Sequence, residues 1–283
     1  MRKYLLLIFE LVAFLFVIQL FAFGLNVLLS LDLNNTFDMM IMEMAVFCII
    51  SLAAYLILRF WEKKPFSDLG LSFCGRWKDA LWGMLIAAGI YAVGFSISLL
   101  AGWVRVTDIA FPAKDVAVAL LLMIFTALQE EVMNRGFVLG RMLNVGMNPF
   151  LAVLLSSVFF AMLHLSNPGI TPLAVVNIVL AGILLGLPYV YTRNLTFSIV
   201  LHMFWNWIQN SVLGYAVSGL EFGESVFSIE LSNHALMNGG EFGFEGSLPC
   251  TVLMIVAIGV VLKYVIPRLK QAESEKIINQ DII

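Results

Sequence analysis

Residues 115–142 read DVAVALLLMIFTALQEEVMNRGFVLGRM, an apolar run with two glutamates and an arginine close together just past its middle. A helix of this length can cross the ~30 Å hydrocarbon layer of a membrane. Ionisable residues at that depth are costly, and by default they mark a functional site. The stretch therefore predicts a membrane-spanning helix and the region of the chain in which a site should be sought.

Similar apolar runs recur along the whole chain. Of its 283 residues, 61% are apolar and 12% are charged, against roughly 45–50% and about 25% in soluble globular domains. Such a chain has too little polar surface to cover a water-soluble core. We therefore expect an all-α membrane protein, a single polytopic domain over residues 1–283 with a bundle of about eight transmembrane helices. The candidate spans are at about 5–29, 39–61, 79–102, 115–142, 148–166, 171–192, 195–218 and 248–266.

The basic residues predict the orientation of these spans, because Lys and Arg in short loops tend to stay in the cytoplasm. With the N-terminus inside, 13 of the 16 basic residues are on the cytoplasmic side. Both termini, including a tail at 267–283, are then cytoplasmic, and we expect an integral protein of a bacterial cytoplasmic membrane. The 13 residues are Arg2, Lys3, Arg59, Lys63, Lys64, Arg76, Lys78, Arg141, Arg193, Lys263, Arg268, Lys270 and Lys276.

The loop at 219–247 contains five glutamates and no Lys or Arg, which fits an external position. Its Gly-rich, aromatic sequence would suit a lid or a substrate-recognition surface, but a solvated connector is the preferred interpretation. The first apolar run is longer than the usual signal-peptide core of about 7–15 residues, so we expect a retained helix there.

Charge and cysteine content exclude other classes of protein. A net charge of -3 and a pI near 5.6 leave no basic face for nucleic acid. Cys48, Cys74 and Cys250 are scattered, without C-x-x-C spacing. They indicate neither a disulfide framework nor a cysteine-based zinc site.

Spacing along the helix distinguishes the roles of the charged residues within the 115–142 run. Glu131 and Arg135 are four residues apart with the acid first, which favours an ion pair on one helical face. Glu130 points about 100° away around the helix, so its partner must come from another helix. Glu130 is therefore available for chemistry. Glu10 and Glu43 are close enough to helix ends to reach the membrane interface.

Two histidines and an asparagine lie in later spans. His164 closes the stretch FFAMLH at 159–164, and His202 and Asn206 share a helical face. A lone histidine in a helix is usually structural, but two of them with an unpaired glutamate favour a common site. His164 comes late in an outward-running span and His202 early in one. A helix break near residues 167–169, or a tilted span, is needed to bring them to one depth.

These residues resemble the motifs of the CAAX-protease and bacteriocin-processing family, also called CPBP or Abi, of intramembrane glutamic endopeptidases. Each motif alone is weak, but the three together on separate predicted spans are specific. The resemblance covers about residues 115–210. The family pattern of E-E-x-x-x-R, F-x-x-x-H and H-x-x-x-N/D is matched in order by Glu130-Glu131-x-x-x-Arg135, Phe160-x-x-x-His164 and His202-x-x-x-Asn206.

The resemblance implies an intramembrane endopeptidase without a metal or other cofactor. By motif position, Glu130 and His164 would activate water, while His202 and Asn206 would form an oxyanion hole, whose donors are typically worth about 3–4 kcal/mol each. The implied partners are the lipid bilayer and a peptide or protein in or at the membrane. Family members trim prenylated CAAX tails or are linked to bacteriocin maturation, immunity or peptide signalling, and no residue here chooses among these.

Two other interpretations stay open. Glu130, His164 and His202 could supply the three protein ligands of a catalytic zinc, although the sequence lacks H-E-x-x-H. A proton relay or a non-catalytic membrane scaffold or immunity protein would also contain buried Glu and His. Asn206 and the doubled glutamate favour hydrolysis over these roles.

Overall fold

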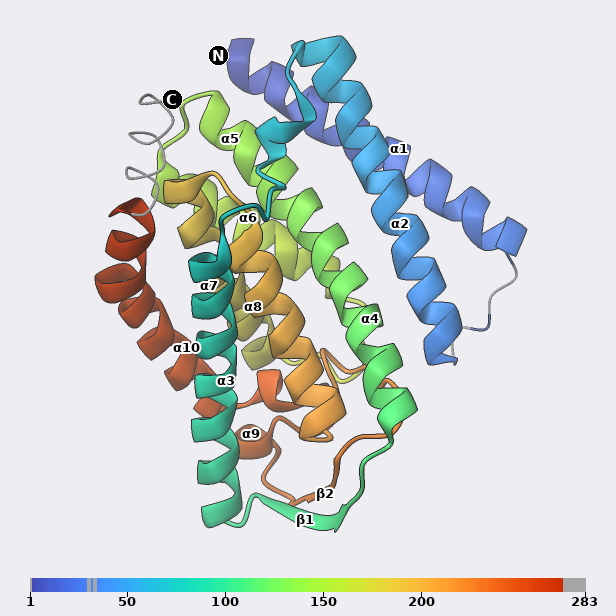
Figure 1. Cartoon of the computed structure of the whole chain (residues 1–283), viewed down its shortest axis with the longest axis vertical. Helices are drawn as coiled ribbons and strands as arrows, with labels where there is room; N and C mark the ends of the chain where they lie inside the picture. The colour runs from blue at the N-terminus through green and yellow to red at the C-terminus, as the bar shows by residue number, and fades with distance from the viewer. Residues whose placement is uncertain (1, 30–31, 33–34, 272–283) are drawn as a thin grey trace.

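The computed structural model describes residues 2–29, 32 and 35–271, and its described part is mostly helical (Figure 1). Of the expected cytoplasmic tail at 267–283, residues 267–271 continue the last helix, and residues 272–283 lie outside the described residues. The helices run roughly along one direction. In Figure 1, α1 and α2 lie on one side, α3 and α10 on the other, and α4 and α6 to α8 between them.

Six helices in the described part of the chain are long and apolar enough to cross a membrane, with 21 to 32 residues each. The protein is thus an integral membrane protein by length and composition of its helices. These helices are α1 (Arg2–Leu29), α2 (Thr36–Leu56) extended to Glu62, α3 (Trp77–Leu100), α4 (Ala113–Glu131) extended through α5 (Gly140–Asn144), α7 (Pro172–Thr192), and α10 (Leu248–Val260) extended to Gln271.

The other two expected spans are shorter helices. The span at 148–166 is α6 (Pro149–Leu163), which has 15 residues. At 1.5 Å per residue it is ~22 Å long, less than the ~30 Å of the hydrocarbon layer. The span at 195–218 is α8 (Thr196–Trp207), continued by a π-helical turn at Ile208–Val212. About eight spans is therefore more than the described residues show, because turns end both helices early.

Polar residues and prolines fix where the central helices begin. The Asn148 side chain accepts hydrogen bonds from the backbone N–H groups of Phe150 and Leu151 at the start of α6, and Thr171 accepts from Ala174 at the start of α7. A proline follows each cap, where its missing N–H costs no helical hydrogen bond. The sequence therefore sets the first turn of two helices that carry the site.

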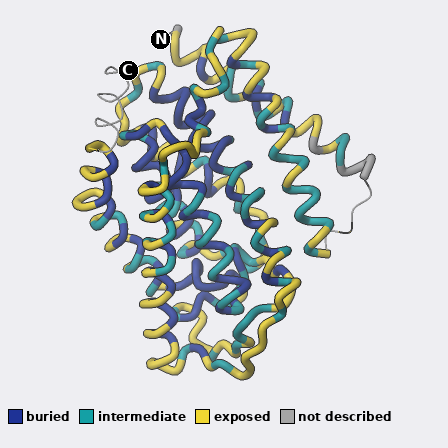
Figure 2. The backbone as a smooth tube through the Cα atoms, in the orientation of Figure 1, coloured by how far each residue is buried: buried dark blue, intermediate teal, exposed yellow. Residues whose placement is uncertain are grey.

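The 219–247 segment is folded against the bundle. Strand β2 (Phe227–Leu231) pairs antiparallel with β1 (Val104–Ile109), and a short helix, α9 (Ala235–Asn238), follows. Phe242 and Phe244 are fully buried. Figure 2 shows that the buried segments lie mainly inside the bundle and the exposed ones on its outer faces and ends. The expectation of a solvated connector is wrong for this last part, because its aromatic side chains complete the apolar core.

Different elements lie at the two ends of the helical bundle. The start of α1 and the end of α10 lie toward one end, and β1, β2 and α9 lie at the other (Figure 1). Apolar residues of α3, α7, α8 and α10 form one core, and those of α1, α2, α4 and α6 form most of a second. Helices α7 and α8 contribute to both cores, so residues on them can face a space between the two.

Candidate active site

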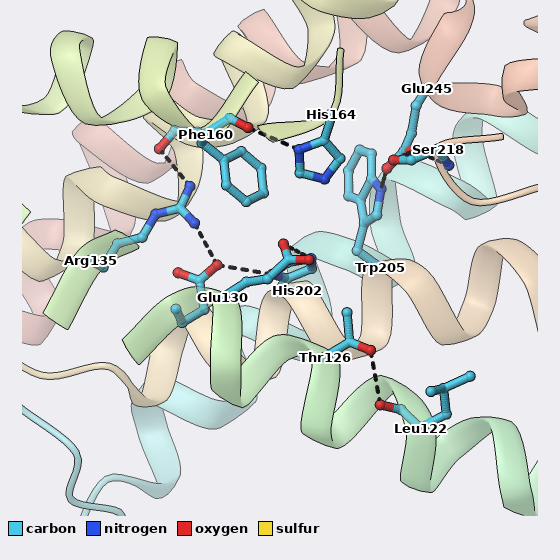
Figure 3. Close-up of polar contacts among 12 residues, drawn as sticks. Leu122, Thr126, Glu130, Arg135, Phe160, His164, His202, Trp205, Ser218 and Glu245 are labelled. Atoms are coloured by element: carbon cyan, nitrogen blue, oxygen red, sulfur yellow. Dashed lines mark hydrogen bonds and ion pairs between the residues drawn. The ribbon is translucent and has the colours of Figure 1, made fainter. Parts of the chain in front are cut away.

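A cavity of about 440 Å³ lies within the helical bundle. Its lining includes all four residues that the sequence assigns to a hydrolytic site: Glu130 of α4, His164 at the end of α6, and His202 and Asn206 of α8. Figure 3 shows the side chains of Glu130, His164 and His202 from these three elements close together. The fold thus brings together groups that lie up to 76 positions apart in the sequence.

Glu131 and Arg135 form an ion pair inside the protein. The Arg135 Nη1 atom lies 2.6 Å from Glu131 Oε1, and both side chains are fully buried. Arg135 also donates to the Gly182 carbonyl oxygen at 3.3 Å, and its guanidinium lies 4.5 Å from the centre of the Phe160 ring. These contacts place the charge of Arg135 against α6 and α7 rather than in the cavity.

Glu130 is in a different environment from its neighbour. Its Oε2 atom is buried and has no hydrogen-bond partner among the described residues. The nearest recorded ion-pair contact is with Nε2 of His202, at 3.8 Å. That distance is too long for a hydrogen bond and leaves the carboxylate oxygen open to a third group.

His164 is placed by a break between two helices. Helix α6 ends at Leu163, His164 is its C-cap residue, and α7 begins at Pro172. His164 and His202 both lie beside the Phe160 ring, with ring centroids 4.7 Å and 6.1 Å away. The break after α6 therefore accounts for how the two histidines reach one cavity.

The hydrogen bond of His164 fixes which nitrogen can act as a base. Its Nδ1 lies 2.9 Å from the backbone carbonyl oxygen of Phe160. Because a carbonyl oxygen only accepts, Nδ1 must carry the proton in this contact. In the neutral ring Nε2 then has the lone pair, which suits proton abstraction.

His202 makes a contact that the sequence analysis did not predict. Its Nδ1 lies 2.9 Å from Glu131 Oε1, the same oxygen that binds Arg135. The buried ion pair therefore also orients a cavity residue. Spacing along one helix cannot reveal this contact, because residues 131 and 202 are 71 positions apart.

Asn206 lies one turn beyond His202 on the same helix and lines the same cavity. Only 5% of it is exposed. Its carboxamide has no hydrogen bond recorded to any described residue, so its N–H groups are available to a bound molecule.

Two further carboxylates line the cavity and were not assigned to it from the sequence. Glu245, from the 219–247 segment, accepts the indole N–H of Trp205 at 2.7 Å and two hydrogen bonds from Ser218 at 2.8 Å (Figure 3). Glu43 of α2 was expected to reach the membrane interface, but that expectation is wrong, because its Oε2 atom is buried. For Glu245, its place directly after Phe242-Gly243-Phe244 was the available signal of burial.

The residues proposed for zinc do not form a ligand set in this arrangement. Within the described part of the chain, no three His, Cys, Asp or Glu side chains are grouped so that they could hold a metal ion. Glu130, His164 and His202 share the cavity, where His202 directs its Nδ1 to Glu131 and His164 directs its Nδ1 to a carbonyl oxygen.

A carboxylate, two imidazoles and a carboxamide around one cavity are groups that can activate water and stabilise a negatively charged oxygen, as an intramembrane hydrolase requires. Residues 112–208 match the family model described as type II CAAX prenyl endopeptidase Rce1-like. That match confirms the resemblance that the motifs indicate, and the matched region contains all four cavity residues. No curated protein and no solved structure matched the chain.

Proposed function

We propose that the protein is an intramembrane endopeptidase that hydrolyses a peptide bond of a membrane-associated or lipidated peptide or protein. The observation that supports this most directly is that Glu130, His164, His202 and Asn206 line one cavity within the family-matched region. A proton relay or a non-catalytic membrane scaffold would not need these four groups around a cavity that can hold a peptide segment.

In the proposed reaction, Glu130 and His164 activate a water molecule. The unpaired Glu130 Oε2 accepts one proton of the water, and the lone pair on His164 Nε2 aligns it. The hydroxide formed attacks the scissile carbonyl carbon, and the tetrahedral intermediate carries a negative oxygen. The proton held by Glu130 then passes to the leaving amine as the C–N bond breaks.

His202 and Asn206 stabilise the negative oxygen in this scheme. The Nδ1–H of His202 is directed to Glu131, so His202 donates through Nε2 only when the ring is doubly protonated. Two carboxylates lie within reach of that imidazolium, Glu131 at 2.9 Å from Nδ1 and Glu130 at 3.8 Å from Nε2. Asn206 supplies a second donor one helical turn away.

The protein is further proposed to have both termini in the cytoplasm and the 219–247 segment outside. The bias of basic residues supports this orientation, as does the position of β2 at the end of the bundle opposite the start of α1. Labelling a single cysteine at position 230 with an impermeant reagent tests it. Labelling only from the cytoplasmic side would reverse the orientation.

The activity is tested with the purified protein in liposomes. Wild-type protein is expected to cleave a subset of membrane peptides, and Glu130→Gln is expected to bind the same peptides without cleaving them. Peptides captured on Glu130→Gln and identified by mass spectrometry then serve as substrates for the wild type. Absence of cleavage of every captured peptide would contradict the proposal.

A further inference from the structure

The wall of the cavity formed by α2 and α4 has hydrogen-bond acceptors that no described residue satisfies. Buried side-chain oxygens without a partner include Oε2 of Glu43, Oε1 of Gln129 and Oε2 of Glu130. All three side chains line the cavity. Gln129 is independent evidence beside the two acids, since it is neutral and only 9% exposed.

The other buried carboxylates nearby each have at least one oxygen with a donor. Oε1 of Glu131 is bonded to Arg135 and His202, while its Oε2 has no partner among the described residues, and Glu245 accepts hydrogen bonds from Trp205 and Ser218. A buried carboxylate without a donor is costly, and the cost is largest in an apolar surrounding. The unpaired oxygens of Glu43 and Gln129, which line the cavity, are therefore available to a donor on a bound molecule.

The chemistry of that donor follows from the cavity. Glu43 and Glu130 are both acids that line the cavity, where like charges would repel, and no Lys or Arg is among the residues that line it. A cation relieves this repulsion, whereas a neutral donor relieves it only partly. Apolar side chains of Met39, Leu122 and Met123 border the same wall and suit the methylene stem of a long cationic side chain.

We propose that Glu43 and Gln129 bind a lysine or arginine side chain of the peptide substrate. Glu43 pairs with the cationic head, and the Gln129 carbonyl oxygen accepts one of its N–H groups. Glu130 is left to the water molecule. This inference rests on the proposed function, because it treats the cavity as the place where a peptide lies before cleavage.

The test uses transmembrane model peptides that each carry one lysine at a different position, with counterparts in which norleucine replaces it. Norleucine keeps the stem and removes the amine. Binding of fluorescent peptides is measured by anisotropy in detergent, with no need for cleavage. Wild-type protein is expected to bind at least one lysine peptide about 10-fold or more tightly than its norleucine counterpart, as a charge-assisted hydrogen bond implies.

Two variants locate the effect. Glu43→Gln is expected to remove most of the lysine preference and to leave norleucine binding unchanged, and Gln129→Met is expected to reduce the preference by a smaller factor. Glu10→Gln is the matched control, because it makes the same substitution in another spanning helix outside the cavity lining. It is expected to keep the full preference.

The outcomes separate this inference from the proposed function. The inference is overturned if the wild type binds each lysine peptide and its norleucine counterpart equally. This result does not depend on whether Glu43→Gln folds. It would mean that Glu43 is neutral and bonds only to water. Cleavage without a lysine preference would leave the endopeptidase proposal intact. A lysine preference that Glu43→Gln removes, without cleavage of any peptide, would support the binding site and contradict the endopeptidase.

Discussion

The two sides of α4 carry adjacent glutamates in opposite surroundings. On the packed side, Glu131 is fully buried and its Oε1 atom binds both Arg135 and His202, although its Oε2 atom has no partner among the described residues. On the cavity side, Glu130 has no ion pair this close: its buried Oε2 atom lies 3.8 Å from His202 Nε2 and has no hydrogen-bond partner among the described residues. Each charge inside a membrane protein has a cost, and a partner offsets it only for Glu131. The comparison indicates that the packed side maintains the fold and that the cavity side is available for chemistry.

The two sides are joined at one residue. His202 contacts Glu131 at 2.9 Å through Nδ1 and approaches Glu130 to 3.8 Å through Nε2. The packed side therefore also sets the orientation of a ring that faces the cavity. Variants on each side are expected to differ in what they damage first.

The largest effect is expected on the cavity side. Glu130→Gln should reduce the cleavage rate by about 10²–10⁴-fold, because it removes a general base. It removes no interaction that holds helices together, so the yield of folded protein and the melting temperature should stay near those of the wild type. Cleavage assays and thermal unfolding on the same preparation measure both. A large loss of folded protein would instead mean that Glu130, like Glu131, is needed for the stability of the fold.

Substitutions on the packed side are expected to reduce the stability of the folded protein. Glu131→Gln or Arg135→Ala leaves one buried charge without its partner, at a cost of about 3–5 kcal/mol. Much less folded protein should be recovered, as measured by size-exclusion chromatography of the detergent extract. Equal yields and melting temperatures for these variants and Glu130→Gln would remove the distinction between the two sides.

The position of each glutamate relative to its own helix could be predicted from the sequence, but its surroundings could not. Four-residue spacing predicts the Glu131–Arg135 contact, since it depends only on helical geometry. The contact between His202 and Glu131 depends on how α8 packs against α4, and no local pattern encodes it. Glu43 was misplaced for the same reason. Its distance from the helix end is local, whereas the cavity beside it is made by other helices.

Helix number shows a related limit. Hydropathy identified every long span, but α6 has 15 residues because the turn after Leu163 ends it early. That early end puts His164 at a helix terminus beside the cavity. No residue pattern distinguishes this break from a tilted helix, and only the packing of α6 against its neighbours decides between them.

A smaller effect is expected at Asn206, whose unpaired carboxamide extends the cavity side onto α8. Asn206→Ala should lower kcat by about 100- to 1000-fold with little change in KM, because the donor acts mainly on the charged oxygen of the transition state. Asn206→Asp should lose less activity, since a protonated carboxyl can still donate. An unchanged kcat with slightly reduced stability would instead make Asn206 a link between helices, worth about 0.6 kcal/mol.

The smallest effect is expected from chelation, which tests whether the cavity side has a hidden partner. A bound zinc would coordinate the unpaired Glu130 oxygen. The two glutamates would then differ in what they bind, a metal or Arg135, and Glu130 would not be the general base. If water is activated by Glu130 and His164 alone, incubation with a strong chelator such as phenanthroline leaves cleavage unchanged, while the same treatment inactivates a zinc-dependent protease assayed alongside. Loss of activity that added zinc restores would favour the metal alternative. The Nδ1 contacts of the two imidazoles with Glu131 and the Phe160 carbonyl would stay in place in that case, since a metal-bound histidine commonly donates its other N–H to such a group.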